Sequence, residues 1–128
     1  MLEVGMKGTG EDEVTVANTA KAFRSGALEV YSTPAMISLM EEVCWKMVQK
    51  NLEPGQGSVG TRLDIEHVSA SPVGMKITCE ATLVAIERRK LTFEVVCRDS
   101  KGVIGKGIHE RFIVTKESFM EKAEGKLK

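Results

Sequence analysis

The clearest pattern of apolar positions along the chain predicts a helix over residues 34–51. Its apolar residues recur at spacings of three and four, as on one side of an α-helix: Met36, Ile37, Leu39, Met40, Val43, Cys44, Met47 and Val48. Thr33 is a good N-cap residue, and Pro34 suits the first helical turn, where its missing N–H leaves no bond unmade. Residues 52–57, which include a proline and two glycines, end the helix.

Four segments of alternating apolar and polar residues follow the helix. They span residues 58–68, 75–86, 91–98 and 103–114, and short polar turns separate the last three. Period-two alternation interrupted by short turns predicts a meander of four consecutive antiparallel strands. A terminal helix is expected from about Lys116, with Phe119, Met120 and Ala123 on one side.

The region before the first helix carries weaker signals. Residues 1–12 are rich in glycine and acidic side chains and are expected to be flexible, whereas residues 14–17 and 28–31 are interpreted as short strands. The helix has a wide apolar stripe and the strands share an apolar face, so each is expected to cover the other. Residues 1–128 are therefore predicted to form a single α+β domain with an antiparallel sheet wrapped around one long central helix. This arrangement resembles the hotdog fold, whose members are dimers with sites at the subunit interface.

Length and composition exclude several classes of protein. A chain of 128 residues, 42% apolar and 28% charged, is typical of one globular domain with its own core. Lys+Arg and Asp+Glu both number 18, so the excess of positive charge that indicates nucleic-acid binding is missing. The apolar stretches are too short to span a membrane and the N-terminus lacks a secretion signal, so we expect a cytoplasmic protein. The widely spaced Cys44, Cys79 and Cys97 indicate buried thiols rather than disulfides or a zinc site.

Few side chains are candidates for acid–base chemistry. His67 continues the apolar face of its strand and is expected to point at the helix; a lone histidine in such a position is more often a core residue than a catalyst. His109 is interpreted mainly as a strand residue. Glu41 lies at the edge of the apolar stripe of the helix, where it is either a general base facing a half-buried pocket or a boundary residue with its carboxylate in water. Glu42 lies on the polar face and is interpreted as a surface charge.

Thr33 and a glycine-rich segment each allow two interpretations. Thr33 either caps the helix or binds an anion or a carbonyl group at the helix N-terminus, where backbone N–H groups converge. Gly55, Gly57 and Gly60 fit the pattern G-x-G-x-x-G. The pattern here follows a helix and opens a strand, the reverse of the dinucleotide-binding context, so it is interpreted as a turn.

Three stretches of the chain resemble the fluoroacetyl-CoA thioesterase family within the hotdog thioesterase superfamily. They are Val-Tyr-Ser-Thr-Pro-Ala-Met-Ile-Ser-Leu-Met-Glu at residues 30–41, residues 52–61 continuing through 65–75, and Gly-Ile-His-Glu-Arg at residues 107–111. The resemblance covers roughly residues 28–115, with Thr, Glu and His in the family's order and spacing. It implies that Thr33, Glu41 and His67 are the catalytic residues. It also implies that the backbone N–H of Gly60 binds the thioester carbonyl and that Arg111 contacts the substrate or supports the site.

The resemblance further implies an enzyme that hydrolyses a small or medium acyl-CoA to the free acid and CoA. CoA enters as part of the substrate, no other cofactor or metal is expected, and a homodimer with sites at the subunit interface is implied. The family's fluoroacetyl enzyme carries a phenylalanine-bearing lid before the threonine, whereas residues 17–28 of this chain look shorter and contain only Phe23. We therefore expect an ordinary acyl-CoA substrate rather than fluoroacetyl selectivity.

Two other functions stay open at this point. One is a non-catalytic acyl-CoA-binding module, which would bind the thioester without releasing thiol. The other is an enoyl-CoA hydratase, which needs an Asp/His pair near a strand-to-helix junction, where this chain has only Glu41. Basic candidates for contact with the CoA phosphates are Arg88, Arg89, Lys90 and Lys106, although a solvated charge cluster is the more common meaning of such a group.

Overall fold

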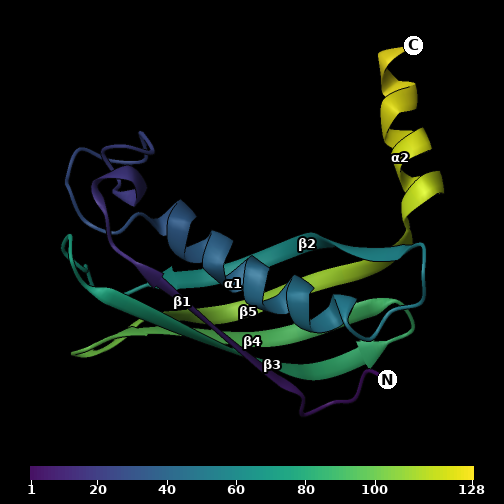
Figure 1. Ribbon diagram of the computed structural model, residues 1–128, viewed down its shortest axis with the longest axis horizontal. Coiled ribbons are helices and arrows are strands. Elements are labelled where there is room, and N and C mark those ends of the chain that lie inside the picture. Colours follow the sequence, from purple (N-terminus) through teal and green to yellow (C-terminus); the bar gives the residue numbers. More distant parts are fainter.

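The computed structural model describes residues 1–128 and shows a five-stranded antiparallel sheet that curves around one long helix (Figure 1). The elements in chain order are β1 (Lys7–Glu13), the 3-10 turn η1 (Val16–Asn18), α1 (Thr33–Gln49), β2 (Gln56–His67), β3 (Lys76–Glu87), β4 (Lys90–Asp99), β5 (Gly102–Thr115), α2 (Lys116–Glu124) and the 3-10 turn η2 (Gly125–Leu127). The predicted α+β class, with the sheet around a central helix, is confirmed.

The strands lie in the order β1-β3-β4-β5-β2. β3, β4 and β5 form the predicted meander. β2 pairs with β5 and not with β3, so the prediction of four consecutive meander strands is wrong. The turns after β3 and β4 are too short to do anything but join neighbouring strands, whereas residues 68–75 are long enough to cross the sheet. As a result β2 is an edge strand.

The other edge of the sheet is made by a segment that we expected to be flexible. β1 pairs with β3 over its whole length, whereas residues 14–17 form no strand and residues 28–31 make only isolated bridges. The glycines of β1 explain why the prediction of flexibility was wrong. Because glycine has no side chain, β1 can lie close to α1. A Cβ atom on Gly10 would lie 2.7 Å from Cγ2 of Val43. Gly8 and Gly10 therefore permit close packing on α1 and do not indicate flexibility.

The core fills the space between α1 and the inner face of the sheet. The buried residues of α1 are Ala35, Met36, Leu39, Met40, Val43, Cys44, Met47 and Val48. The strands contribute Ile77, Cys79, Ala81, Leu83, Leu91, Phe93, Val95, Cys97 and Ile104. All three cysteines are buried and free, as predicted. Burial raises the pKa of the Cys44 thiol to about 12, so this cysteine is an inert part of the core.

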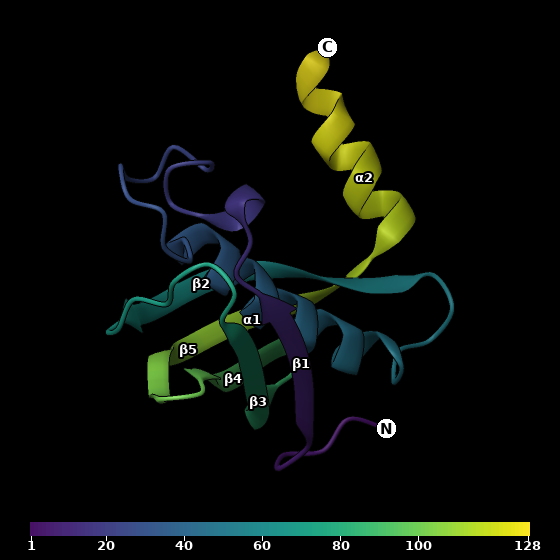
Figure 2. The same ribbon diagram turned by 60° about the vertical axis from the view of Figure 1, so that its left-hand side comes forward.

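The C-terminal helix projects away from the rest of the domain (Figures 1 and 2). α2 begins at Lys116, as predicted, and none of its residues is buried. Its apolar side chains Phe119 and Met120 are both exposed. Neither α1 nor α2 is long and apolar enough to cross a membrane.

Ser32, and not Thr33, caps α1. The Ser32 Oγ accepts a hydrogen bond of 3.1 Å from the backbone N–H of Ala35, and the Ser32 side chain is buried. Thr33 is already the first residue of the helix, so the predicted start was one residue late, and the helix ends at Gln49. The capping interpretation of Thr33 is therefore wrong, and its hydroxyl is available for another partner.

Replacement of Ser32 should weaken the domain more than replacement of another serine of the same helix. Ser32→Ala leaves a helix N–H without an acceptor and should lower the free energy of unfolding by about 0.5–2 kcal/mol. Ser38→Ala is the matched control, because it removes an exposed hydroxyl of α1 and leaves the cap intact. Urea unfolding of both variants measures the difference. Equal losses in the two would show that Ser32 is not the cap.

Candidate active site

Thr33 and His67 are brought into direct contact by the ends of two elements. Thr33 opens α1 and His67 is the last residue of β2. The Thr33 Oγ1 lies 2.7 Å from Nδ1 of His67, within hydrogen-bond distance. The prediction that His67 points towards the helix is confirmed. When a hydroxyl group is hydrogen-bonded to an imidazole, the histidine can remove a proton from an attacking oxygen.

The environment of His67 keeps its imidazole ring neutral. Burial lowers its pKa below the ordinary value of 6.5. A neutral ring has one bare nitrogen that can accept a proton. The other ring nitrogen, Nε2, is buried and has no hydrogen-bond partner. Leaving such a group unpaired costs about 1–3 kcal/mol, and groups of this kind are rare in native structures.

A cavity of about 350 Å³ opens beside the Thr33–His67 pair. It is lined by Ala20, Ser25, Val30, Tyr31, Thr33, His67, Val68, Ser69 and Ala70. The segment between η1 and α1 forms one wall, and the connection after β2 forms another. Most of the apolar wall consists of alanine and valine. Phe23, the only phenylalanine of the segment 17–28, is half-exposed and does not line this cavity.

Glu41, Gly60 and Arg111 form a second cluster, on α1, β2 and β5. The Glu41 Oε2 lies 3.6 Å from Nη1 of Arg111, and the Arg111 side chain is only 7% exposed while that of Glu41 is 38% exposed. Gly60 packs on this carboxylate, because a Cβ atom there would lie 2.7 Å from Oε2. Glu41 thus lies at the edge of the apolar stripe, as predicted. Glu42 is on the surface, paired with Lys46.

The two groups of candidate residues lie apart within the chain. Thr33 and Glu41 are two helical turns from each other, about 12 Å along α1 at 1.5 Å per residue. Gly60 and His67 are separated by roughly 23 Å along β2 at 3.3 Å per residue. The structure therefore joins Thr33 to His67, and Glu41 to Gly60 and Arg111. It does not unite all five residues at one place.

Two residues of the second cluster were missed or underrated by the sequence interpretation. Ser58 accepts two hydrogen bonds of 2.9 Å from Arg111, one at its Oγ and one at its backbone oxygen. His109 is fully buried, and its Nε2 lies 3.1 Å from Nη1 of Arg111. His109 and Arg111 are two apart on β5, so they share one face of the strand. That spacing was the available signal, but it does not reveal that α1 covers this face.

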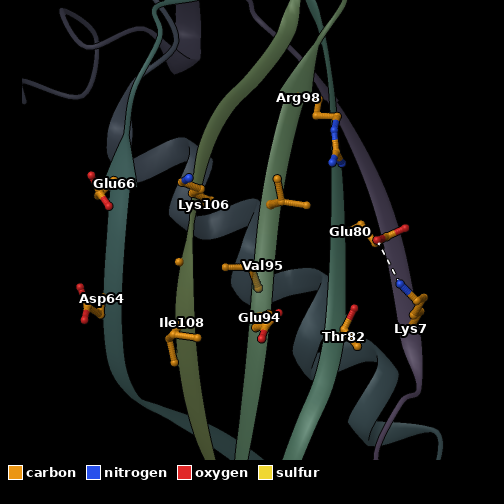
Figure 3. A pocket seen from close by; sticks show the side chains of 12 residues that line it. Lys7, Asp64, Glu66, Glu80, Thr82, Glu94, Val95, Arg98, Lys106 and Ile108 are labelled. Carbon is orange, nitrogen blue, oxygen red and sulfur yellow. Dashed lines mark hydrogen bonds and ion pairs between the residues drawn. The ribbon is translucent and has the colours of Figure 1, made fainter.

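The basic residues considered for the CoA phosphates do not converge on the cavity. Arg89 lies over the ring of Phe112, 5.4 Å from its centroid, and Lys90 is 3.8 Å from Glu110. Lys106 lies on the sheet face away from α1, in a groove of about 610 Å³ (Figure 3). Figure 3 shows that side chains of both charges line this groove: Lys7, Asp64, Glu66, Glu80, Glu94, Arg98 and Lys106. A solvated charge cluster describes these residues better than a phosphate site.

Comparison with known proteins places the chain among thioesterases. The model of the fluoroacetyl-CoA-specific thioesterase family matches residues 14–117. The fluoroacetyl-CoA thioesterase of Streptantibioticus cattleyicolor is 39% identical over 98 residues, which cover 77% of this chain and 70% of that enzyme. A solved structure of a fluoroacetyl-CoA thioesterase superposes with a TM-score of 0.93 at 32% identity, covering 98% of each chain.

Two further solved structures extend the comparison. A variant of the fluoroacetyl-CoA-specific thioesterase in complex with fluoroacetate and CoA has a TM-score of 0.88 at 34% identity, over 92% of this chain and 99% of that one. A hot-dog-like protein from Thermanaerovibrio acidaminovorans has a TM-score of 0.90 at 24% identity, over 98% and 93% of the two chains. The predicted hotdog fold is confirmed.

Both histidines should titrate below the ordinary range in the folded protein. Burial lowers the pKa of His67 and of His109, so their ring C–H signals should move in an NMR titration only below pH 6.5. The unfolded chain then binds more protons than the folded one at such pH, and the free energy of unfolding should fall as the pH decreases from 6.5. His67→Gln and His109→Gln assign the two signals. A midpoint at or above 6.5 for either signal contradicts this view of its surroundings.

Proposed function

This chain belongs to the fluoroacetyl-CoA-specific thioesterase family, and from that premise we propose that it hydrolyses a small or medium acyl-CoA with Thr33, Glu41 and His67 as its catalytic residues. The products are the free acid and CoA. The observation that carries the proposal is the 2.7 Å contact of Thr33 Oγ1 with Nδ1 of a neutral, half-buried His67 beside a cavity.

In the proposed reaction His67 acts first as general base. Its Nδ1 takes a proton from the attacking oxygen, which belongs either to Thr33 itself or to a water molecule held by Thr33. The oxygen bonds to the thioester carbon, the carbon–sulfur bond breaks, and the CoA sulfur leaves with the proton that His67 returns. Positioned acid–base catalysis of this kind contributes about 10²- to 10⁴-fold. If Thr33 is acylated, water releases the acid in a second, equivalent step.

Gly60 is the proposed donor to the thioester oxygen. It is exposed on the edge strand β2, where backbone N–H groups that face away from β5 have no strand to pair with. One such donor is worth about 2.7–4 kcal/mol when charge develops on the oxygen. Arg111 is proposed to contact the substrate or to support the site. Its link to the other catalytic candidates is the ion pair with Glu41.

We propose that a second copy of the chain completes the site in a homodimer. Glu41 and Gly60 are distant from Thr33 in one chain, so a partner must supply them if all are to act on one thioester. The surface beside Glu41 fits such a partner. Trp45, one turn further along the same side of α1, is 41% exposed. Leu63 is in register with the buried His109 and so lies on the inner sheet face, yet it too is 41% exposed.

The acyl group is proposed to be an ordinary one, in the cavity beside Thr33. No phenylalanine lines that cavity, so nothing there matches the phenylalanine-bearing lid of the fluoroacetyl enzyme. Alanine and valine leave room for a short alkyl chain instead. The reduced, buried cysteines fit an enzyme of the cytoplasm, where we place it.

The purified protein should release free CoA from at least one acyl-CoA in a panel from acetyl to palmitoyl, followed with a thiol reagent. His67→Ala should lower kcat on that substrate by about 10²- to 10⁴-fold, because it removes the general base. Thr33→Ala and Glu41→Gln should also lower it. Glu42→Gln is the matched control, since it removes the neighbouring carboxylate on the solvent face.

The outcomes separate the three candidate functions. Thiol release that is lost in His67→Ala supports the thioesterase. Tight acyl-CoA binding by calorimetry without thiol release indicates a binding module. Conversion of an enoyl-CoA without thiol release indicates a hydratase. Unchanged turnover in all three variants would refute the assignment of the catalytic residues.

The proposed dimer should dissociate when charge is placed on its exposed apolar surface. Leu63→Glu should give a monomer in sedimentation experiments and lose thiol release, because β2 would then meet its partner with a buried charge. Val103→Glu is the matched control, since Val103 is similarly exposed, at 38%, near the turn between β4 and β5. A monomeric wild type that is fully active would overturn the proposal that the site is shared.

A further inference from the structure

His109 is a buried, polar and titratable residue that the proposed mechanism does not use. It is 0% exposed and lies on the inner face of β5, stacked on Phe93 with the ring centroids 6.3 Å apart. An apolar side chain would fill this place without the cost of burying polar atoms. Both ring nitrogens lie within hydrogen-bond distance of a partner, so the polar atoms of the ring are used in the structure.

The partners of the ring determine where its proton lies. Nδ1 is 2.9 Å from the backbone oxygen of Arg62, and a carbonyl oxygen can only accept, so Nδ1 carries the hydrogen. Nε2 is 3.1 Å from Nη1 of Arg111, and a guanidinium can only donate, so Nε2 is bare. His109 is therefore held as one neutral tautomer with its acceptor aimed at Arg111.

Arg111 is fixed from three sides by these contacts. Its Nε donates to Ser58 Oγ and its Nη2 donates to the Ser58 backbone oxygen, both at 2.9 Å. Its Nη1 donates to His109 and lies 3.6 Å from Oε2 of Glu41. Ser58 holds one edge of the guanidinium plane and His109 holds the other. Without His109, the edge that faces Glu41 has no fixed acceptor.

We propose that His109 is a positioning residue that turns the Nη1 edge of Arg111 towards Glu41 and Gly60. The proposal rests on the proposed function, because it assigns His109 a purpose only if Glu41, Gly60 and Arg111 serve the thioester site. The charged groups near the ring are Arg111 and Glu110 on β5 and Glu41 on α1, while β4 presents the apolar Phe93. Protonated Nε2 would point an N–H at a guanidinium N–H, so only the neutral ring can hold Arg111.

Two substitutions separate the two nitrogens of the ring. In His109→Gln the side-chain oxygen reaches the place of Nε2 and can still accept from Arg111. In His109→Asn the shorter side chain reaches the place of Nδ1 and can still donate to the Arg62 carbonyl, but Arg111 loses its acceptor. Both remove the aromatic ring, but only His109→Asn also leaves Nη1 of Arg111 without its acceptor. The free energy of unfolding is therefore measured for each variant and compared with its kcat.

Thiol release on a competent acyl-CoA should therefore fall much further in His109→Asn than in His109→Gln. The expected difference in kcat is between about 10- and 100-fold, because a small displacement of a group near the reacting atoms lowers the rate by factors of this size. In an independent NMR measurement, the Nη hydrogens of Arg111 should give separate signals in the wild type and in His109→Gln. In His109→Asn the two hydrogens of Nη1 should merge into one signal, because this group has lost its acceptor and can rotate, while Ser58 still holds Nε and Nη2.

The outcomes distinguish this proposal from the function on which it rests. Equal kcat values for the Gln and Asn variants of an active enzyme, or activities that follow stability alone, overturn the role of His109 and leave the thioesterase intact. Absence of thiol release in the wild type overturns the proposed function, and the catalytic purpose of His109 with it. In that case the NMR signals still report whether His109 holds Arg111.

Discussion

The packing of one side of α1 against the inner face of the sheet is the constraint on which the candidate site depends. Eight residues of the helix are buried, so its rotation about its own axis is fixed. A rotation by one residue, about 100°, would bring polar side chains into the core. With the rotation fixed, Glu41 faces Gly60, and the first residue of α1 meets the last residue of β2. The geometry of the candidate site thus depends on hydrophobic packing.

The sequence was most informative about features that depend on a single helix or strand. The apolar spacing of α1 identified both the helix and the position of Glu41 at the edge of the buried stripe. The period-two alternation of β2 indicated that His67 points inward. These patterns are local, because they depend on residues a few positions apart. They can therefore be interpreted without knowing which distant segments pair. The contact between Thr33 and His67 is different: only the resemblance to a family linked the two residues.

The errors arose where the outcome depended on pairing between distant segments. Alternation shows that β2 is a strand but not which strand lies beside it, and β2 lies beside β5. Gly10 suggested flexibility because no local feature shows that Val43 occupies the space where its side chain would be. Ser32 and Thr33 are both favourable N-cap residues, with serine the better of the two, and the fold shows which of them caps the helix. His109 was interpreted as an ordinary strand residue. Its role as an acceptor for Arg111 follows only from the burial of both side chains, which the sequence does not show.

The half-buried His67 and the buried His109 both have a lowered pKa, but the bonding of their rings differs in a way that matches their proposed roles. Both nitrogens of His109 are bonded, so its ring cannot exchange a proton without breaking a contact. His67 has one bonded nitrogen and one buried nitrogen without a partner. A ring with both nitrogens bonded holds its neighbour in place, whereas His67 keeps one ring nitrogen out of any hydrogen bond. The unpaired edge of β2 and the exposed Leu63 are the two features that a second chain would cover. They are the reason why we propose a shared site.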